Sequence, residues 1–188
     1  MTRIHAHNGA LIAEYARERR IFVPINTIPK RVIAAFLSAE DRRFYDHGGV
    51  DFQGIARAVF KVIEAKIQGN DRRAEGGSTI TQQVAKNFLL SSERSMQRKL
   101  KEAILAIRIE RAFTKEQILE LYMNEIYLGA GAYGVAAAAD TYWGKALNEL
   151  SISDVAYLAT LPKAPSNYDP FKHPERAIER RNLSLIHI

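Results

Sequence analysis

The chain has 188 residues, of which 47% are hydrophobic and 26% charged, and these globular values argue against a disordered segment. Lys and Arg outnumber Asp and Glu by 27 to 21, and the net charge of +6 suits an anionic partner, although a solvated basic surface explains it equally well. The absence of cysteine excludes a disulfide framework and a thiolate metal site, and no apolar window reaches the ~20 residues that span a bilayer.

The first part of the chain predicts extended backbone and then helices. Two short apolar runs, residues 11–15 and 20–25, predict a pair of extended segments ahead of the main body. Pro29, followed by apolar residues at helical spacing, predicts a first helix. Asp51 is a suitable N-cap for a second helix that runs to Gly69.

The later helices are marked by their caps. Residues 70–77 contain Arg72, Arg73 and two glycines, which predicts a mobile basic loop. Three capping boxes follow, at Thr79 with Gln82, Thr114 with Gln117, and Ser151 with Asp154. Residues 92–113 carry two apolar stripes and predict a long central helix, residues 135–143 predict an alanine-rich helix, and Pro162 is expected to end the helix that Ser151 opens. The architecture is therefore mainly α, without the alternation of strands and helices that builds a parallel sheet.

Glu40 is the first candidate catalytic residue. It follows Val32 and Phe36 at intervals of four, so helical periodicity places its carboxylate on the buried or cleft-facing side. Partial desolvation raises the pKa of a carboxylate and strengthens it as a proton acceptor. The alternative is that Glu40 only ends the helix and faces water. Periodicity alone slightly favours this alternative, because Asp41 and two arginines follow at once.

Glu102 is the second candidate. One apolar stripe of the long predicted helix, through Leu105 and Ile109, extends backwards to Glu102 and then to Arg98, which places charge where burial is expected. The alternative is an ordinary surface pair between Arg98 and Glu102, which would contribute only ~0.2 to 0.5 kcal/mol.

The segment before the third predicted helix could hold a phosphate. Gly76 and Gly77 give flexible backbone, the helix N-terminus at Thr79 offers free N–H groups, and Lys86 lies two turns inside. The spacing is not that of a Walker motif, and a glycine-rich loop is usually only a loop. His47 has no second ligand at metal-binding spacing and is expected to be a hydrogen-bonding structural residue.

Four segments in order resemble the motifs of the family 51 peptidoglycan glycosyltransferases, specifically those of class A penicillin-binding proteins. They are residues 40–51 (EDRRFYDHGGVD), 76–87 (GGSTITQQVAKN), 98–102 (RKLKE) and 120–129 (ELYMNEIYLG). The resemblance covers roughly residues 10–182, and four long motifs in order are far more specific than any single pattern.

The resemblance implies a mainly α, lysozyme-like fold with a groove beside the membrane. It implies that Glu40 is the base that takes the proton from the 4-hydroxyl of an acceptor N-acetylglucosamine. Glu102, with Lys86 and Arg98, would manage the leaving pyrophosphate of the donor. A divalent cation, Mg or Mn, could assist there with Glu102 as its ligand, although no cofactor is expected to be required. The other motif positions expected to line the substrate site are Asp41, Phe44, His47, Thr79, Gln83, Asn87 and Lys99.

The resemblance also implies a longer parent protein. Residues 1–28 are expected to form an extended lead-in, residues 29–182 the glycosyltransferase domain, and residues 183–188 a truncated tail. Family members carry an upstream membrane helix, and the class A members add a downstream transpeptidase domain. We therefore expect a bifunctional enzyme anchored on the outer, periplasmic side of the bacterial cytoplasmic membrane. Its expected partners are lipid II, the growing glycan strand and an anionic membrane surface, the last partly through the basic loop 70–77.

Two other readings compete with this one. A lysozyme-like hydrolase or lytic transglycosylase would also use a glutamate at a helix end, but it would leave Lys86, Arg98 and the glycine loop without a role. A non-catalytic basic module would bind lipid, glycan or nucleic acid through charge alone and would not need Glu40. No basic motif interleaved with aromatic residues supports nucleic acid, so no nucleic-acid partner is expected.

Overall fold

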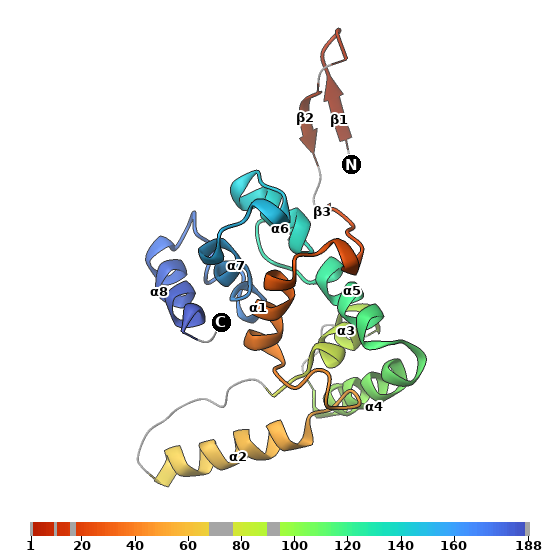
Figure 1. The fold of residues 1–188 in the computed structure, drawn as a ribbon, viewed down its shortest axis with the longest axis vertical. Helices are drawn as coiled ribbons and strands as arrows, with labels where there is room; N and C mark the ends of the chain where they lie inside the picture. The colour runs from red at the N-terminus through yellow and green to blue at the C-terminus, as the bar shows by residue number, and fades with distance from the viewer. Residues whose placement is uncertain (1, 10, 16–17, 68–76, 90–94, 187–188) are drawn as a thin grey trace.

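The computed structural model describes residues 2–9, 11–15, 18–67, 77–89 and 95–186, and the predicted mainly helical architecture is confirmed (Figure 1). The helices are α1 (Lys30–Glu40), α2 (Phe52–Ile67), α3 (Ile80–Leu89), α4 (Met96–Ala112), α5 (Lys115–Glu125), α6 (Val135–Trp143), α7 (Ile152–Leu158) and α8 (Pro174–Leu185). The short elements are β1 (Thr2–His5), β2 (Leu11–Tyr15), β3 (Arg19–Arg20), β4 (Ala132–Tyr133) and the 3-10 turns η1 (Ile25–Thr27), η2 (Leu147–Glu149) and η3 (Leu161–Lys163).

The helices begin where the sequence predicts. All three capping boxes form, because each cap side chain accepts from the backbone N–H three residues on while the Gln or Asp side chain binds the backbone N–H of the cap. Asp51 caps α2 through its Oδ1, which accepts from Gly54 N at 2.9 Å. Helix α4 begins at Met96 with Ser95 as its cap, whereas the predicted start near residue 92 lies outside the described residues.

The packed body of the molecule is built from α1, α5, α6 and α7 (Figure 1). Phe36 of α1 and Tyr122 of α5 are fully buried and meet edge to face, with ring centroids 6.3 Å apart. Burying a large apolar side chain of this kind contributes about 1.5–3 kcal/mol. This body fixes α1, and with it the position of Glu40.

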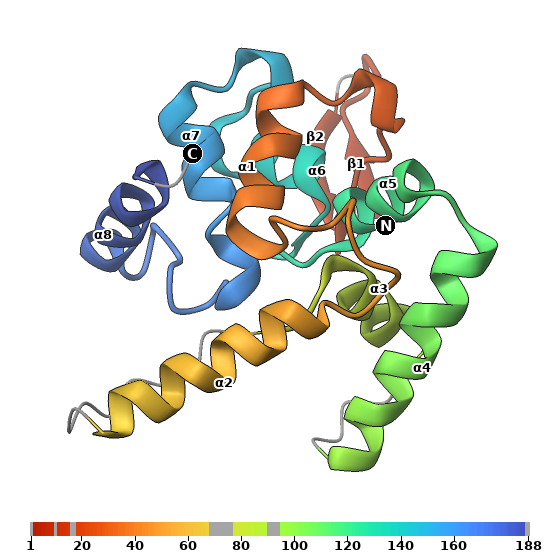
Figure 2. The same ribbon diagram turned by 60° about the horizontal axis from the view of Figure 1, so that its bottom comes forward.

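Helices α2 and α4 extend away from the packed body (Figure 2). In α4 only Glu102 and Ala106 are buried, while Leu100 and Ile104 are 63% and 46% exposed. The prediction that this long helix is central is therefore wrong. Other helices do not cover both of its apolar stripes, because the main helix contacts of α4 are with α3 and α5.

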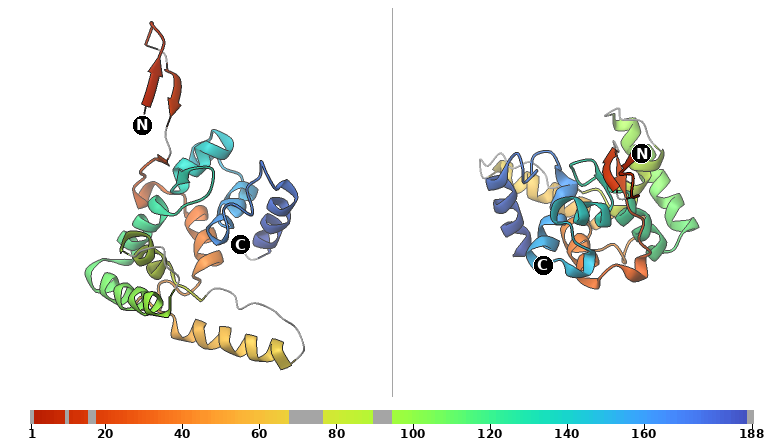
Figure 3. Two further views of the ribbon diagram at one scale, coloured as in Figure 1. Left: turned by 180° about the vertical axis from the view of Figure 1, so that it is seen from behind. Right: turned by 90° about the horizontal axis from the view of Figure 1, so that it is seen from above.

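The predicted pairing of the two N-terminal extended runs is also wrong. Strand β2 pairs antiparallel with β1, and this hairpin projects beyond the helices (Figure 3). Strand β3 pairs in parallel with β4, and Arg19 N donates to Gly131 O at 2.8 Å. The next residues bind α5, since Val23 N donates to the side chain of Asn124 and Ile25 N to that of Glu120. The backbone of the second run thus forms its hydrogen bonds with α5 and with the chain around β4, and not with the first run.

Helix α7 ends at Leu158, earlier than the predicted stop at Pro162. Thr160 N donates to Tyr157 O at 3.0 Å, which tightens the chain into a turn before the proline is reached. Pro162 lies instead within the 3-10 turn η3, where its missing N–H is not needed. At the other end of the chain, α8 continues past residue 182 to Leu185.

Candidate active site

Glu40 is half-buried at the last position of α1. Its Oε2 accepts a hydrogen bond of 2.8 Å from Gln83 Nε2 in α3. Burial raises the pKa of Glu40 above the ordinary value of 4.5, and the Gln83 hydrogen bond and the charges of Lys163 and Arg180 oppose this only in part. Glu40 is therefore a partly buried, hydrogen-bonded carboxylate, and the alternative of a side chain that simply faces water, which periodicity alone slightly favours, is not observed.

A pocket of about 230 Å³ lies next to this hydrogen bond. Its lining from α3 is Gln83, Lys86 and Asn87, three of the predicted site residues. The other lining residues are Ile126, Tyr127, Pro162 and Pro165. The carboxylate that holds Gln83 thus stands beside an open space lined by an ammonium and amide groups.

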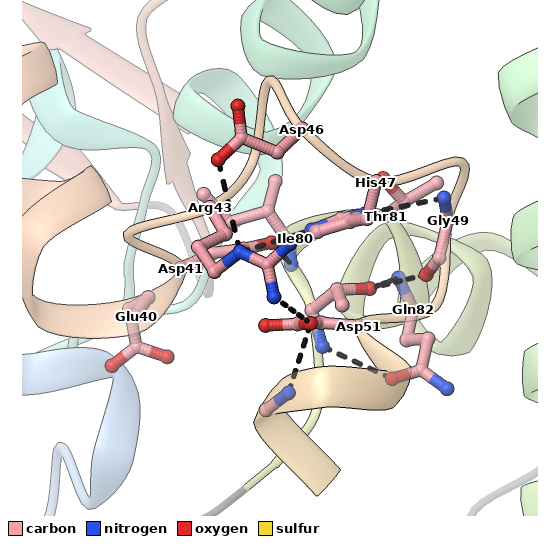
Figure 4. Close-up of polar contacts among 12 residues, drawn as sticks. Glu40, Asp41, Arg43, Asp46, His47, Gly49, Asp51, Ile80, Thr81 and Gln82 are labelled. Carbon is pink, nitrogen blue, oxygen red and sulfur yellow. Dashed lines mark hydrogen bonds and ion pairs between the residues drawn. The ribbon is translucent and has the colours of Figure 1, made fainter. Parts of the chain in front are cut away.

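Asp41, His47 and Thr79 have buried side chains that belong to one hydrogen-bonded network. Figure 4 shows Asp41 and His47 on the loop that follows Glu40. Asp41 accepts from His47 Nε2 at 3.0 Å and from the backbone N–H of Ile80 at 3.0 Å. His47 Nδ1 accepts from Gly49 N, so its proton is on Nε2 and points to Asp41. Thr79 Oγ1 donates to Gly49 O at 2.6 Å. These groups are engaged within the protein, as predicted for His47, and join the start of α3 to residues 41–51, the α1–α2 loop.

Phe44 packs against this network and does not line the pocket. Its side chain is fully buried and its ring packs edge to face with His47 at a centroid distance of 6.3 Å. Gly49 brings the same loop against α4, because a Cβ at this position would lie 2.7 Å from the backbone of Ala106. The α1–α2 loop therefore connects Glu40 to the helix that carries Glu102.

Glu102 is buried in α4, with a side chain only 3% exposed. Its Oε1 lies 3.2 Å from Arg98 Nε and its Oε2 2.9 Å from Lys99 Nζ. Lys99 also donates to Ser78 Oγ, just before α3, at 2.7 Å. The alternative of an ordinary surface pair is wrong, because the carboxylate is buried and joined to two cations.

Several groups around Glu40 were not singled out from the sequence. The charges of Lys163 in η3 and Arg180 in α8 lower the pKa of Glu40, and the charges of Glu40 and Asp41 raise the pKa of the fully buried Tyr122 beyond the effect of burial. Tyr127 lies within the fourth motif, so that motif could have marked it as a pocket residue. Lys163 and Arg180 gave no such signal, because chain folding alone brings them to Glu40.

Glu102 does not belong to a metal site made by protein side chains alone within the described residues. Both carboxylate oxygens already face cations, and the described residues contain no group of three or more His, Cys, Asp or Glu side chains that could hold a metal. Within the residues that the structure describes, no helix is long and apolar enough to cross a membrane.

Comparison with known proteins decides the family. Residues 8–188 match the transglycosylase family. The chain belongs to this family. The predicted kinship with the glycosyltransferase domain of class A penicillin-binding proteins is thereby confirmed, and so is its assignment as a glycosyltransferase-family enzyme.

Three relatives of this transglycosylase-family chain are longer proteins. It is 56% identical over 185 residues to penicillin-binding protein 1A of Rickettsia felis, which covers 98% of this chain and 23% of that protein. It is 49% identical over 182 residues to penicillin-binding protein 1A of Escherichia coli K12, covering 97% of this chain and 21% of that one. A crystal structure of penicillin-binding protein 1A from Haemophilus influenzae matches 98% of this chain and 17% of its own chain, with a TM-score of 0.53 at 31% identity. The chain thus spans less than a quarter of these relatives, and the similarity supports the mainly helical fold.

Proposed function

We propose that this chain is a peptidoglycan glycosyltransferase that polymerises lipid II, the disaccharide-peptide carried on a lipid pyrophosphate, into β-1,4 glycan strands. The observation that carries the proposal is Glu40, a half-buried carboxylate with a raised pKa that hydrogen bonds Gln83 beside the pocket with Lys86 and Asn87. A carboxylate of this kind can accept a proton near neutral pH more readily than a solvated one.

In the proposed reaction Glu40 takes the proton from the 4-hydroxyl of the acceptor N-acetylglucosamine. The freed oxygen attacks the anomeric carbon of the donor, and the bond to the lipid pyrophosphate breaks. Because neither carboxylate attacks carbon, the transfer is one direct displacement with inversion, so the α-linked donor gives a β-linked product.

The departing pyrophosphate needs positive charge more than a proton. Lys86, at the pocket, and Arg98 and Lys99, around Glu102, are the cations that would supply it. Glu102 would act by holding the two α4 cations in place rather than by touching the sugar. Asp41, Phe44, His47 and Thr79, predicted as substrate residues, are better suited to positioning Glu40 and α3, since their side chains are already engaged within the protein.

A glycan hydrolase or lytic transglycosylase is the competing enzyme class. It would need the same base or acid at Glu40, but it would have no use for cations beside the leaving group. The buried pairing of Glu102 with Arg98 and Lys99 supports transfer from a pyrophosphate donor.

We also propose that the chain works at the outer surface of the bacterial cytoplasmic membrane as part of a longer protein with a transpeptidase domain. Helix α2 supports membrane contact, because many of its large apolar residues are exposed. They are Phe52, Ile55, Val59, Phe60, Ile63 and Ile67. Met96, Leu100 and Ile104 form a second exposed apolar stripe on α4. The predicted basic loop contributes Arg72 and Arg73, which lie outside the described residues.

The deciding experiment is incubation of the purified protein with lipid II and detection of polymer on a gel. Polymer that disappears with Glu40→Gln and is digested by a muramidase would support the proposal. Release of shortened glycan from preformed strands, without polymer from lipid II, would favour the hydrolase class instead.

A further inference from the structure

Lys115 occupies a position that local helix energetics disfavour. It is the first residue of α5, where the positive end of the helix dipole repels an ammonium and favours an acid such as the adjacent Glu116. The capping box of Thr114 and Gln117 already provides hydrogen-bond acceptors for backbone N–H groups at the start of this helix. The reason for a lysine at this position must therefore be a tertiary contact.

The Lys115 ammonium is held on three sides. Its Nζ donates to His47 O at 2.6 Å and to Glu110 Oε1 at 2.8 Å, and it lies 4.5 Å from the centroid of the Phe44 ring. Lysine has three N–H donors, and these contacts use two of them while the ring attracts the charge. The side chain is 19% exposed, so its polar contacts are largely shielded from water and are stronger than surface contacts.

The partner carboxylate joins two further helices. Glu110 belongs to α4, and the same oxygen that accepts from Lys115 also accepts from Thr81 Oγ1 of α3 at 2.6 Å. Thr81 is fully buried. Lys115 and Glu110 together therefore connect α3, α4, α5 and the α1–α2 loop.

This connection joins the two segments that carry the proposed functional carboxylates. His47, whose carbonyl Lys115 holds, binds through its ring to Asp41, the neighbour of Glu40. Glu110 follows Glu102 by eight residues, which is about 12 Å along a helix. Gly49 also brings the loop against α4. A close backbone approach, however, does not fix the orientation of the loop relative to the helix as hydrogen bonds to a charged group do.

We propose that Lys115 is a positioning residue of the glycosyltransferase site. By binding the His47 carbonyl and the Glu110 carboxylate together, it holds α4 with Glu102 in a fixed relation to the loop that follows Glu40. The assignment rests on the proposed function, because it assumes that both carboxylates act on one substrate pair. A misplacement of about 1 Å between such groups can cost on the order of a hundredfold in rate.

The test compares Lys115→Met, Glu110→Gln, the double variant and Lys115→Arg in the purified protein. Lys145→Met is the matched control, because its Nζ lies 3.8 Å from Asp154 and joins neither carboxylate region. Val155→Ala, in the core of α7, serves as a control for lost stability. Steady-state kinetics with lipid II give kcat and KM, and hydrogen exchange reports separately on the α1–α2 loop, α4 and α7.

We expect Lys115→Met and Glu110→Gln each to lower kcat on the order of a hundredfold with a smaller change in KM. The double variant should be no worse than either single one, and Lys115→Arg should recover part of the rate. Exchange should increase in the loop and α4 but not in α7. Activity like that of Val155→Ala at equal loss of Tm, or a uniform rise in exchange, would overturn the proposal. If the wild type makes no polymer, the proposed function fails, and the exchange pattern still decides whether Lys115 holds the two elements together.

Discussion

Glu40 and Glu102 are both helical glutamates, but the chain surrounds them differently. Glu40 ends α1 at the edge of the packed body, where burial raises its pKa and a neutral amide, that of Gln83, is its hydrogen-bond donor. Glu102 lies in the projecting helix α4, and both of its oxygens face cations. The first carboxylate is paired with a neutral amide and the second with two cations, so neighbouring charge rather than burial alone separates the two proposed roles.

The largest effect expected from this comparison is on the Glu40 side. Glu40→Gln keeps the shape of the side chain but cannot accept the proton, so polymerisation should fall about 10²–10⁴-fold. Fluorescent lipid II and gel analysis of the polymer measure the rate, with Glu116→Gln, an exposed glutamate of α5, as the matched control. Polymer formation by Glu40→Gln at near the wild-type rate would remove this residue from the base role.

The product and the quenched enzyme test the same assignment chemically. Direct displacement predicts a β-1,4 bond and no covalent sugar on the protein. Mass spectrometry of wild type and Glu40→Gln stopped during turnover is the measurement. A glycosyl adduct on Glu40 or Glu102 would contradict the mechanism and revive the retaining hydrolase alternative.

Stability should separate the two glutamates even where activity does not. Glu102→Gln should be comparably inactive, and it should also lower Tm, because it removes the anion that two cations face at a buried position. Glu40→Gln should leave Tm unchanged or raise it, since folding penalises the charged Glu40. Differential scanning calorimetry at neutral pH measures both, and equal losses of Tm would break the comparison.

The pH dependence of that difference follows from the sign of the shift. The pKa of Glu40 is raised in the folded protein above its ordinary 4.5, so the native state binds more protons and loses stability as the pH rises through this range. The Tm advantage of Glu40→Gln should therefore be present at neutral pH and disappear as the pH falls towards 4.5. The acid limb of kcat/KM in the wild type should likewise lie above this value. If the difference in Tm between Glu40→Gln and the wild type did not change with pH, the titration of Glu40 would not be its cause.

Lys86 should show a smaller but still severe effect on the pyrophosphate side. Lys86→Ala should lower kcat/KM about 10²-fold, because it removes one of the charges that we propose stabilise the leaving pyrophosphate. Lys86→Arg keeps the charge and should lose less. Steady-state kinetics with lipid II distinguish the two, and unchanged rate and substrate affinity in Lys86→Ala would contradict the assignment of this pocket to the pyrophosphate.

The smallest expected effect concerns the projecting region. Phe60→Ser, on the exposed face of α2, should weaken co-sedimentation with anionic vesicles several-fold, and added salt should weaken it further. Phe22→Ser is the matched control, since Phe22 is 69% exposed and Phe60 76% but only the latter lies on α2. Equal loss in both variants, or no binding of the wild type at low salt, would count against α2 as the membrane-facing part.

The sequence by itself determined most helix starts, because a capping box is a contact between residues three positions apart and needs no tertiary partner. It also marked Glu40, Gln83, Lys86 and Asn87, which share a hydrogen bond or a pocket wall. Periodicity could not decide whether Glu40 faced a cleft or water. That outcome depends on α3, which follows it only after another helix.

The tertiary structure decided the rest. It covered Glu102 within a helix whose apolar stripes are otherwise largely exposed, and it gave β3 a partner in β4 rather than in β2. It also brought the charges of Lys163 and Arg180 near enough to lower the pKa of Glu40, and it placed Lys115 between the α1–α2 loop and α4. Local patterns show which face of a segment is apolar. The partner of a buried charge or of an unpaired strand edge is instead a group from a distant part of the sequence, which only folding brings close.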